Sequence, residues 1–272
     1  GADNVAVGHL ALDANTTGNT NVAIGENAMG ANTTAANNIA IGSQAMAANT
    51  TGTRNLAIGV NAYDASDTEN DNLAIGYNAM TTDTAGGTAN VALGNYALDA
   101  LTSGDNNVCV GNNAGTVINS GGSNTCIGAS AGHPINTGNY NTCIGESAGN
   151  QLTTGDYNVF IGRAAGYQVA TSDNQLYIAR DNTAASNAAT WIYGNASGAC
   201  YQGNNATAWT QTSDERIKKN IVNSPKGLTE INALQVRNFN FRTQDEVTVE
   251  GLNTSDAPGL QTGVIAQEIE SV

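Results

Sequence analysis

Short apolar segments recur along most of this chain at a fixed distance. The pattern Asn, aliphatic, small, aliphatic, Gly begins at Asn4 and returns at a constant spacing of 17. Its copies stand at 4–8, 21–25, 38–42, 55–59, 72–76, 90–94, 107–111, 124–128, 141–145 and 158–162, with one extra residue before the sixth. Residues 176–179 are a degenerate eleventh copy in register. A repeat of this length predicts a solenoid in which each coil stacks on the next.

Each copy alternates with a period of two, as in Val22-Ala23-Ile24, which predicts a short strand. Val22 and Ile24 would lie on one face and Ala23 on the other, and both faces are apolar enough to be covered. A second apolar point follows in every coil, for example Ala28-Met29, and predicts a second short strand. The expected fold is therefore mostly β, a β-solenoid or β-roll of about eleven 17-residue coils. Self-association is expected to cover the Ala face.

The second apolar point of the coil changes character part-way along the chain. In the first six coils its Ala is followed by a large residue, such as Met46 or Tyr63, and from the seventh coil onward by Gly, as at Gly115 and Gly132. We expect the cross-section or the partner contacts of the solenoid to change at about residue 107.

The composition supports a thin, stacked core and argues against some classes of partner. Aromatic residues make up only 5% of the chain, and Gly, Ala, Asn and Thr dominate. The net charge is −14, and residues 1–212 contain three Arg and no Lys against 14 acidic residues. Such a surface repels phosphates, so we expect no nucleic-acid partner. No apolar stretch approaches the roughly 20 residues of a membrane helix, so no membrane insertion is expected.

Three cysteines lie in one column of the repeat. Cys109, Cys126 and Cys143 recur with the period of the repeat, at a strand position that is Ala in earlier coils. A disulfide or a metal site would be the functional interpretation. Packing as small buried hydrophobes is favoured, because reduced Cys packs in this way and no His shares the spacing.

Two polar features could also bind ligands. The Asn column that opens each strand could form a sugar-binding row, but a structural ladder at the turn is the favoured interpretation. The acidic turn 64–71 could hold Ca²⁺, but it lacks the Gly and the terminal Glu of an EF-hand loop, so a solvated loop is favoured. We therefore expect neither a metal nor a cofactor.

The repeat is lost between residues 181 and 212, where four large aromatic residues gather: Trp191, Tyr193, Tyr201 and Trp209. They could form a platform on which a glycan stacks. Packing at a neck is favoured, because the last coil of a solenoid needs a cap.

A different sequence begins with Ser213-Asp214-Glu215-Arg216-Ile217-Lys218-Lys219-Asn220-Ile221. A helix is predicted at 227–234 and a strand at 236–241, and Gly263-Val264-Ile265-Ala266-Gln267-Glu268-Ile269 follows. The first and last of these segments resemble, in the right order, the two signatures of the endosialidase-type intramolecular chaperone family. The expected organisation is a repetitive β-roll shaft at 1–180, a neck at 181–212 and the N-terminal part of a small α+β chaperone domain at 213–272.

The resemblance implies a function and a site. Members of this family stand at the C-termini of phage tail fibres, tail spikes and neck appendages, promote trimer folding, and then cleave themselves off with a Ser/Lys dyad. Carried over, Ser213 is the nucleophile, Lys218 is its base, and Thr212–Ser213 is the scissile bond. The chemistry needs a base beside the hydroxyl, and a desolvated Lys can be neutral enough to serve. Such cleavage is a single turnover, so no turnover enzyme is expected.

The strand pattern Asn-Val-Ala-Ile-Gly resembles the head repeat of trimeric autotransporter adhesins. That resemblance covers roughly residues 4–180 and implies a left-handed parallel β-roll in an intertwined homotrimer, although the 17-residue period is longer than those heads generally use.

Three functions are open from the sequence. The first is a structural tail-fibre segment at the virion tail, with other tail proteins and a host-surface glycan or protein receptor as partners. The second is the head of a trimeric adhesin on a bacterial surface, which would continue into a stalk and a membrane anchor. The third is an enzyme acting on polysaccharide, which needs paired carboxylates, and no coil shows a pair that stands out.

Overall fold

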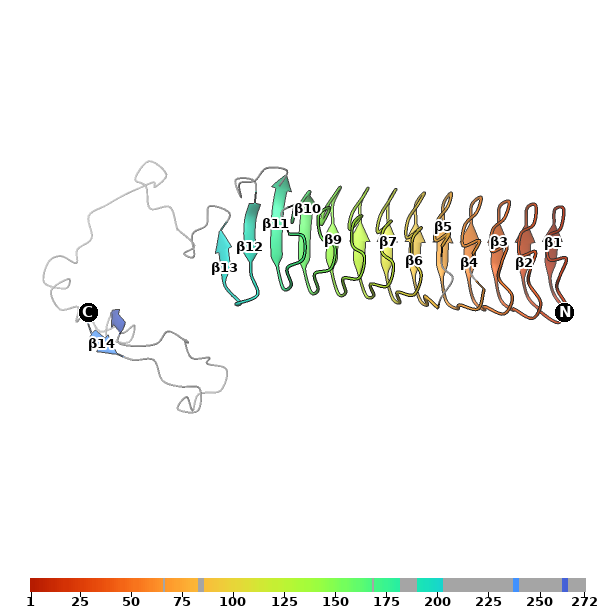
Figure 1. The fold of residues 1–272 in the computed structure, drawn as a ribbon, viewed down its shortest axis with the longest axis horizontal. Helices are drawn as coiled ribbons and strands as arrows, with labels where there is room; N and C mark the ends of the chain where they lie inside the picture. Colours follow the sequence, from red (N-terminus) through yellow and green to blue (C-terminus); the bar gives the residue numbers. More distant parts are fainter. Residues whose placement is uncertain are drawn as a thin grey trace, which may run out of the picture. The chain divides into compact units, whose positions relative to one another are not determined.

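The computed structural model describes residues 1–65, 67–82, 86–167, 169–181, 190–202, 237–239 and 261–263. The chain divides into two compact units, Gly1–Thr210 and Gln211–Val272. The first is the predicted β-solenoid, whose coils stack one on the next (Figure 1).

The solenoid is built on one continuous sheet of 13 strands, β1 to β13, in sequence order. Strands β1 to β11 are parallel and in register, so that Ala23 pairs with Ala40 and Ala40 with Ala57. Strands β12 and β13 then turn back and pair antiparallel. The strands are β1 Val5–Val7, β2 Val22–Ile24, β3 Ile39–Ile41, β4 Leu56–Ile58, β5 Leu73–Ile75, β6 Val91–Leu93, β7 Val108–Val110, β8 Thr125–Ile127, β9 Thr142–Ile144, β10 Val159–Arg163, β11 Leu176–Asp181, β12 Thr190–Gly194 and β13 Cys200–Gln202.

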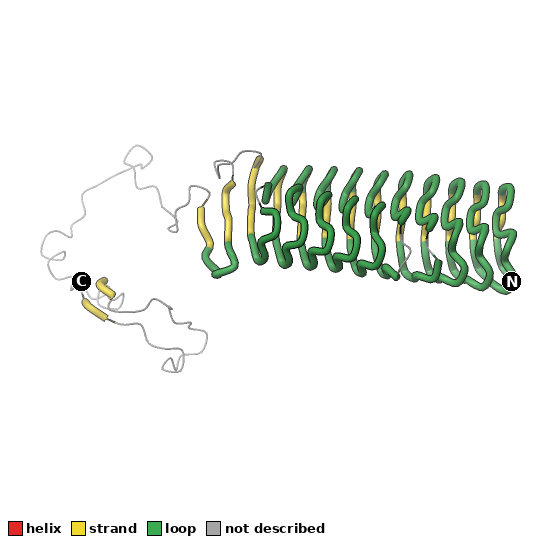
Figure 2. The backbone as a smooth tube through the Cα atoms, viewed as in Figure 1, coloured by secondary structure: helices red, strands yellow, loops and turns green. Residues whose placement is uncertain are grey.

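Each of the first ten coils contains one strand, so the prediction of a second strand was wrong for the coils that the structure describes. Figure 2 shows turns where that strand was expected. The backbone there enters the left-handed region, at φ 53° for Asn27 and 52° for Met29. These turns still stack, because Met29 N donates to Ala45 O at 3.0 Å and Asn27 N donates to His9 O at 2.8 Å. The coil is thus closed by a hydrogen-bonded turn.

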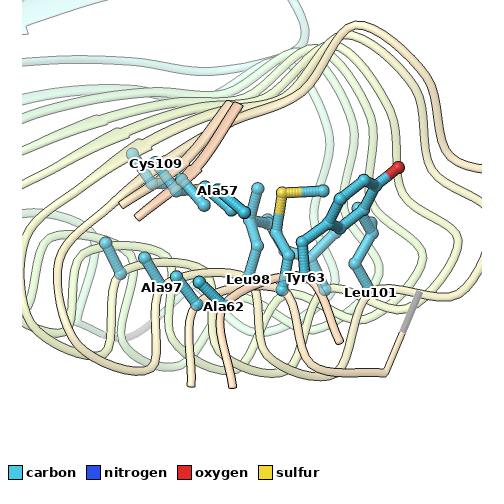
Figure 3. Close-up of a cluster of buried hydrophobic side chains, with 14 of the residues drawn as sticks. Ala57, Ala62, Tyr63, Ala97, Leu98, Leu101 and Cys109 are labelled. Carbon is cyan, nitrogen blue, oxygen red and sulfur yellow. The ribbon is translucent and has the colours of Figure 1, made fainter. Parts of the chain in front are cut away.

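The inner face of the sheet is the Ala face. Ala23, Ala40 and Ala57 are fully buried within the single chain. The space beside them is filled from the opposite wall of the coil by large side chains such as Tyr63 and Leu98 (Figure 3). Met29 is fully buried in the same core cluster. Our expectation that self-association covers the Ala face was therefore wrong, since the chain covers that face itself.

The interior filling changes at the expected place. In the third coil the strand carries Ala40 and the turn carries Met46, whereas in the eighth the strand carries Cys126 and the turn carries Gly132. A Cβ on Gly132 would lie 2.3 Å from Cys126 Sγ and 3.0 Å from Ile135 Cδ1. In the later coils the larger side chains therefore stand in the strand and at Ile135 rather than in the turn, while the in-register ladder continues.

The second unit contains two described strands, β14 at Arg237–Phe239 and β15 at Gln261–Gly263, which pair antiparallel. Strand β14 falls inside the predicted strand 236–241, while the helix predicted at 227–234 lies outside the described residues. In the described part of the chain, no helix is long and apolar enough to cross a membrane.

Candidate functional site

The outer face of the sheet carries mainly aliphatic side chains, and we name it the aliphatic face. It consists of the first and third side chains of β2 to β9 and of Val159 and Ile161 in β10. All of these side chains are half-buried or exposed, for example Ile39 at 40% and Leu93 at 41%. The face comprises Val22, Ile24, Ile39, Ile41, Leu56, Ile58, Leu73, Ile75, Val91, Leu93, Val108, Val110, Thr125, Ile127, Thr142, Ile144, Val159 and Ile161. Its members carry no charge, and an apolar surface of this extent is typical of an interaction site.

The Asn column holds the strands of this face in place. Asn38 N donates to Asn21 Oδ1 at 3.0 Å, and Asn38 Nδ2 donates to Gly52 O at 2.8 Å. The same pair of bonds recurs around Asn55, and these side chains are buried. An amide that is buried and bonded at both ends is not available to a sugar hydroxyl. The column is the structural ladder favoured from the sequence.

The Cys column lies inside the solenoid. Cys109, Cys126 and Cys143 are fully buried, are free thiols, and pair in register along the sheet. Burial raises the pKa of the Cys109 thiol well above its ordinary value, so it stays protonated at neutral pH. Among the described residues, no group of three or more His, Cys, Asp or Glu could hold a metal ion. The cysteines pack as small hydrophobes, as the sequence favoured.

The acidic turn directs its carboxylates to separate internal partners. Glu69 accepts hydrogen bonds from the backbone N–H groups of Asp67 and Thr68, at 2.9 Å and 3.0 Å. Asp71 forms a two-point ion pair with Arg54, at 2.6 Å and 2.8 Å. The pKa of Asp71 is lowered, chiefly by its hydrogen bond from Arg54. These contacts favour the solvated loop over a calcium site.

The aromatic residues after the last coil pack in part as a cap. The ring of Tyr177 lies 5.9 Å from that of Phe160, and Tyr193 lies 6.0 Å from Tyr177, as measured between ring centroids. Trp191 instead stays 63% exposed. Trp209 and the side chain of Tyr201 lie outside what the structure describes.

The predicted cleavage site, Thr212 and Ser213 with Lys218, also lies outside the described residues. Its assignment therefore rests on sequence. Residues 213–272 match the family model described as Chaperone of endosialidase. This segment is therefore similar to the endosialidase chaperone family.

The match confirms the resemblance seen in the two signatures around Ser213 and Gly263. The chaperone segment follows a β-solenoid, and this order fits a tail fibre with a C-terminal chaperone of this kind. The family implies trimer assembly. Comparisons with the curated proteins and with the solved structures gave no match.

Proposed function

We propose that this chain is a shaft segment of a homotrimeric phage tail fibre that serves attachment to the host surface. The shaft at 1–180 supplies a stiff rod, the neck at 181–212 ends it, and the chaperone segment at 213–272 directs assembly of the trimer and then cleaves itself off. The location is the virion tail, where other tail proteins are its neighbours. The host-surface partner is a glycan or a protein.

The observation that carries this proposal is a chaperone segment joined to a shaft whose aliphatic face is uncovered. The sheet of each shaft is complete within one chain, so three shafts would associate side by side along this face rather than share strands. The face repeats with almost the same chemistry in every coil. Three copies could therefore meet out of register at little energetic cost, and a chaperone that fixes the register meets this need.

Sedimentation of the full chain tests the association. We expect a trimer, and we expect Ile41→Asp to weaken it by at least tenfold, because a charge would be buried on the aliphatic face. Thr51→Asp is the matched control, because Thr51 lies in the same coil on an exposed turn. A monomeric wild-type chain, or equal effects of the two substitutions, would contradict the proposal.

Self-cleavage is tested by the mass of the products. We expect the chain to yield a fragment that ends at Thr212, and we expect Ser213→Ala and Lys218→Ala each to abolish that fragment while the shaft still folds. Ser224→Ala in the same segment is the control and should cleave normally. If the wild-type chain stayed at full length, as Ser213→Ala is expected to do, the proposed self-cleavage would be refuted.

The trimeric adhesin head is the second candidate, and the strand motif of the shaft supports it. It would place the protein on a bacterial surface. The chaperone match at 213–272 favours the tail fibre, because the adhesin hypothesis predicts a stalk and an anchor after the head.

A further inference from the structure

Two exposed tyrosines occupy one column of the shaft. Tyr140 and Tyr157 occupy the residue just before the Asn of their coils, and they are 55% and 56% exposed. Their rings stack with centroids 4.9 Å apart and planes 4° apart. Backbone bonds fix both positions, since Tyr140 N donates to Gly122 O at 3.1 Å and Tyr157 N to Asn139 O at 3.0 Å. The two rings are thus held in place without being buried.

The backbone at this position disfavours a bulky side chain. Every described member of the column has a left-handed φ between 55° and 63°. Small or polar residues occupy most of it: Thr20, Asn37, Arg54, Asp71, Ala89, Asn106, Ser123 and Asn174. Asn tolerates this conformation well, whereas an aromatic residue there is strained. Two consecutive tyrosines therefore need a reason other than local backbone preference.

A column of hydrogen-bond acceptors occupies the sequence position just before the tyrosine column. Asn139 N donates to Asp156 Oδ1 at 2.6 Å, and Asp156 N donates to Asp173 Oδ1 at 2.8 Å. In the described part of the chain, the second carboxylate oxygen of Asp156 and of Asp173 has no hydrogen-bond partner, nor do the hydroxyls of Tyr140 and Tyr157. A fixed carboxylate acceptor, Asp156, thus stands next in sequence to the exposed Tyr157, and Asp173 holds the same position one coil later.

We propose that Tyr140 and Tyr157, with Asp156 and Asp173, form a binding platform for an uncharged surface glycan. The C–H faces of a sugar pack on aromatic rings, and its hydroxyls donate to carboxylate oxygens. Residues 1–212 carry three Arg against 14 acidic residues, so this part of the chain is negatively charged. That charge, together with the carboxylates of Asp156 and Asp173, repels anionic sugars. Two half-exposed tyrosines offer roughly 200 Å², whereas a stable protein interface needs about 800 Å² from each partner. The platform therefore fits a saccharide better than a protein, and it gives the proposed attachment function a site.

The test uses the full chain and the double variant Tyr140→Asn/Tyr157→Asn. Asn is native at other positions of this column, such as Asn106 and Asn174, so the variant should melt at the wild-type temperature or above. The double variant Tyr77→Asn/Tyr96→Asn is the matched control, because these rings form another exposed pair, with centroids 5.5 Å apart. All three proteins are applied to an array of neutral and acidic bacterial surface polysaccharides.

We expect the wild-type chain to bind neutral polysaccharides, the platform variant to bind them at least tenfold more weakly, and the control variant to bind as the wild type does. Unchanged binding by the platform variant, or binding of acidic polysaccharides alone, overturns the platform but leaves attachment standing. A wild-type chain that binds no polysaccharide on the array overturns the platform as well. If that chain also fails to bind intact bacteria across a host panel, the attachment function itself fails. A large drop in the melting temperature or a loss of the trimer in the platform variant would mean that the tyrosine pair is structural.

Discussion

The Gly that ends each strand shows how tightly single residues constrain the shaft. Gly42 has φ 138°, and a Cβ placed on it would lie 2.3 Å from the carbonyl oxygen of Gly59 in the next coil. The same contact recurs from Gly8 to Gly145, at 2.2–2.7 Å. Two separate requirements therefore meet at this position, an unusual backbone conformation and close approach of the neighbouring backbone.

We expect Gly42→Ala to lower the free energy of unfolding by about 3 kcal/mol or more, the sum of backbone strain and a backbone clash. Thermal and urea unfolding would measure the loss. Gly86→Ala is the control, because Gly86 also has a positive φ, 112°, but has nothing within 4 Å of an added Cβ. Its expected cost is only about 1 kcal/mol, from strain alone. Equal costs at the two sites would show that close stacking of the Gly column adds nothing.

Asp64 and Asp71 predict opposite dependences on pH. Burial raises the pKa of Asp64, so its charge destabilises the folded state; this cost is absent below the unfolded pKa and complete above the folded pKa. Arg54 lowers the pKa of Asp71, so the charged Asp71 stabilises the folded state. This stabilisation is present above the unfolded pKa and disappears as the pH falls through the folded pKa. We expect Asp64→Asn to gain melting temperature relative to the wild type between pH 3 and pH 7, and Asp71→Asn to lose it. The Asp71 effect should be small, because the ion pair is exposed. If the melting-temperature differences of both variants from the wild type changed in the same direction between pH 3 and pH 7, the opposite roles given to Asp64 and Asp71 would be contradicted.

Within a coil, the strand and the turn opposite share one interior volume. Where the turn carries Met46 the strand carries Ala40, and where the strand carries Cys126 the turn carries Gly132. The two patterns are alternative ways to fill a space of fixed height, since the ladder keeps the same register through both. Substitutions in the strand and in the turn should therefore be coupled.

A double-mutant cycle measures this coupling. We expect Gly132→Ala to cost about 3 kcal/mol in the wild type, because of strain and the contact with Cys126 Sγ. In the Cys126→Ala background we expect about 1 kcal/mol, because the strain remains and the other close contact, with Ile135 Cδ1 at 3.0 Å, is to the end of a flexible side chain that can shift. The interaction energy would be about 2 kcal/mol, well above the few tenths expected of independent sites. Gly132→Ala combined with Cys143→Ala is the control, since Cys143 contacts a different turn glycine, Gly149. An additive cycle would refute the shared volume.

The same volume explains which elements could be predicted from the sequence. The 17-residue period and the strands at Val22 and its equivalents are confirmed, because alternation and Gly are local signals. The second strand was wrong, because the left-handed φ of Asn27 and Met29 is imposed by closing the coil and leaves no local signal. The predicted orientation of the sheet was also wrong, because the Ala face that we expected a partner to cover lies inside the solenoid. Large residues such as Met29 fill the interior from the turn, so the strand has room inside only for Ala.

The candidate sites differ in how far the sequence alone could predict them. Ser213 and Lys218 could be assigned only through resemblance, because a Ser and a Lys five positions apart have no distinctive spacing. The tyrosine platform was missed, although the signal is visible: Tyr140 and Tyr157 occupy the same position of successive coils, in a column of mostly small polar residues. Their exposure and stacking depend on the left-handed backbone before the Asn, which the period alone does not reveal.

At the scale of the whole solenoid, each coil contacts chiefly the coils before and after it. Asn21 accepts from Asn38, Asn38 from Asn55, and Asn55 from Asn72, always one coil away. Stability is then approximately a sum of coil and interface terms. A whole coil should be removable, because its two neighbours present the same column of partners to each other.

We expect deletion of residues 38–54 to leave a folded shaft. Asn55 N would then donate to Asn21 Oδ1, and Leu56 would pair with Val22 in the register that Ile39 has now. The melting temperature should fall by only a few degrees, consistent with a loss of about 1 kcal/mol. Deletion of residues 38–46 is the control, since removing only part of a coil brings turn residues opposite a strand and breaks the columns at that junction. Circular dichroism and thermal unfolding of the full chain would distinguish the two. If removing a complete coil unfolds the chain as thoroughly as removing half of one, the coils are not equivalent units.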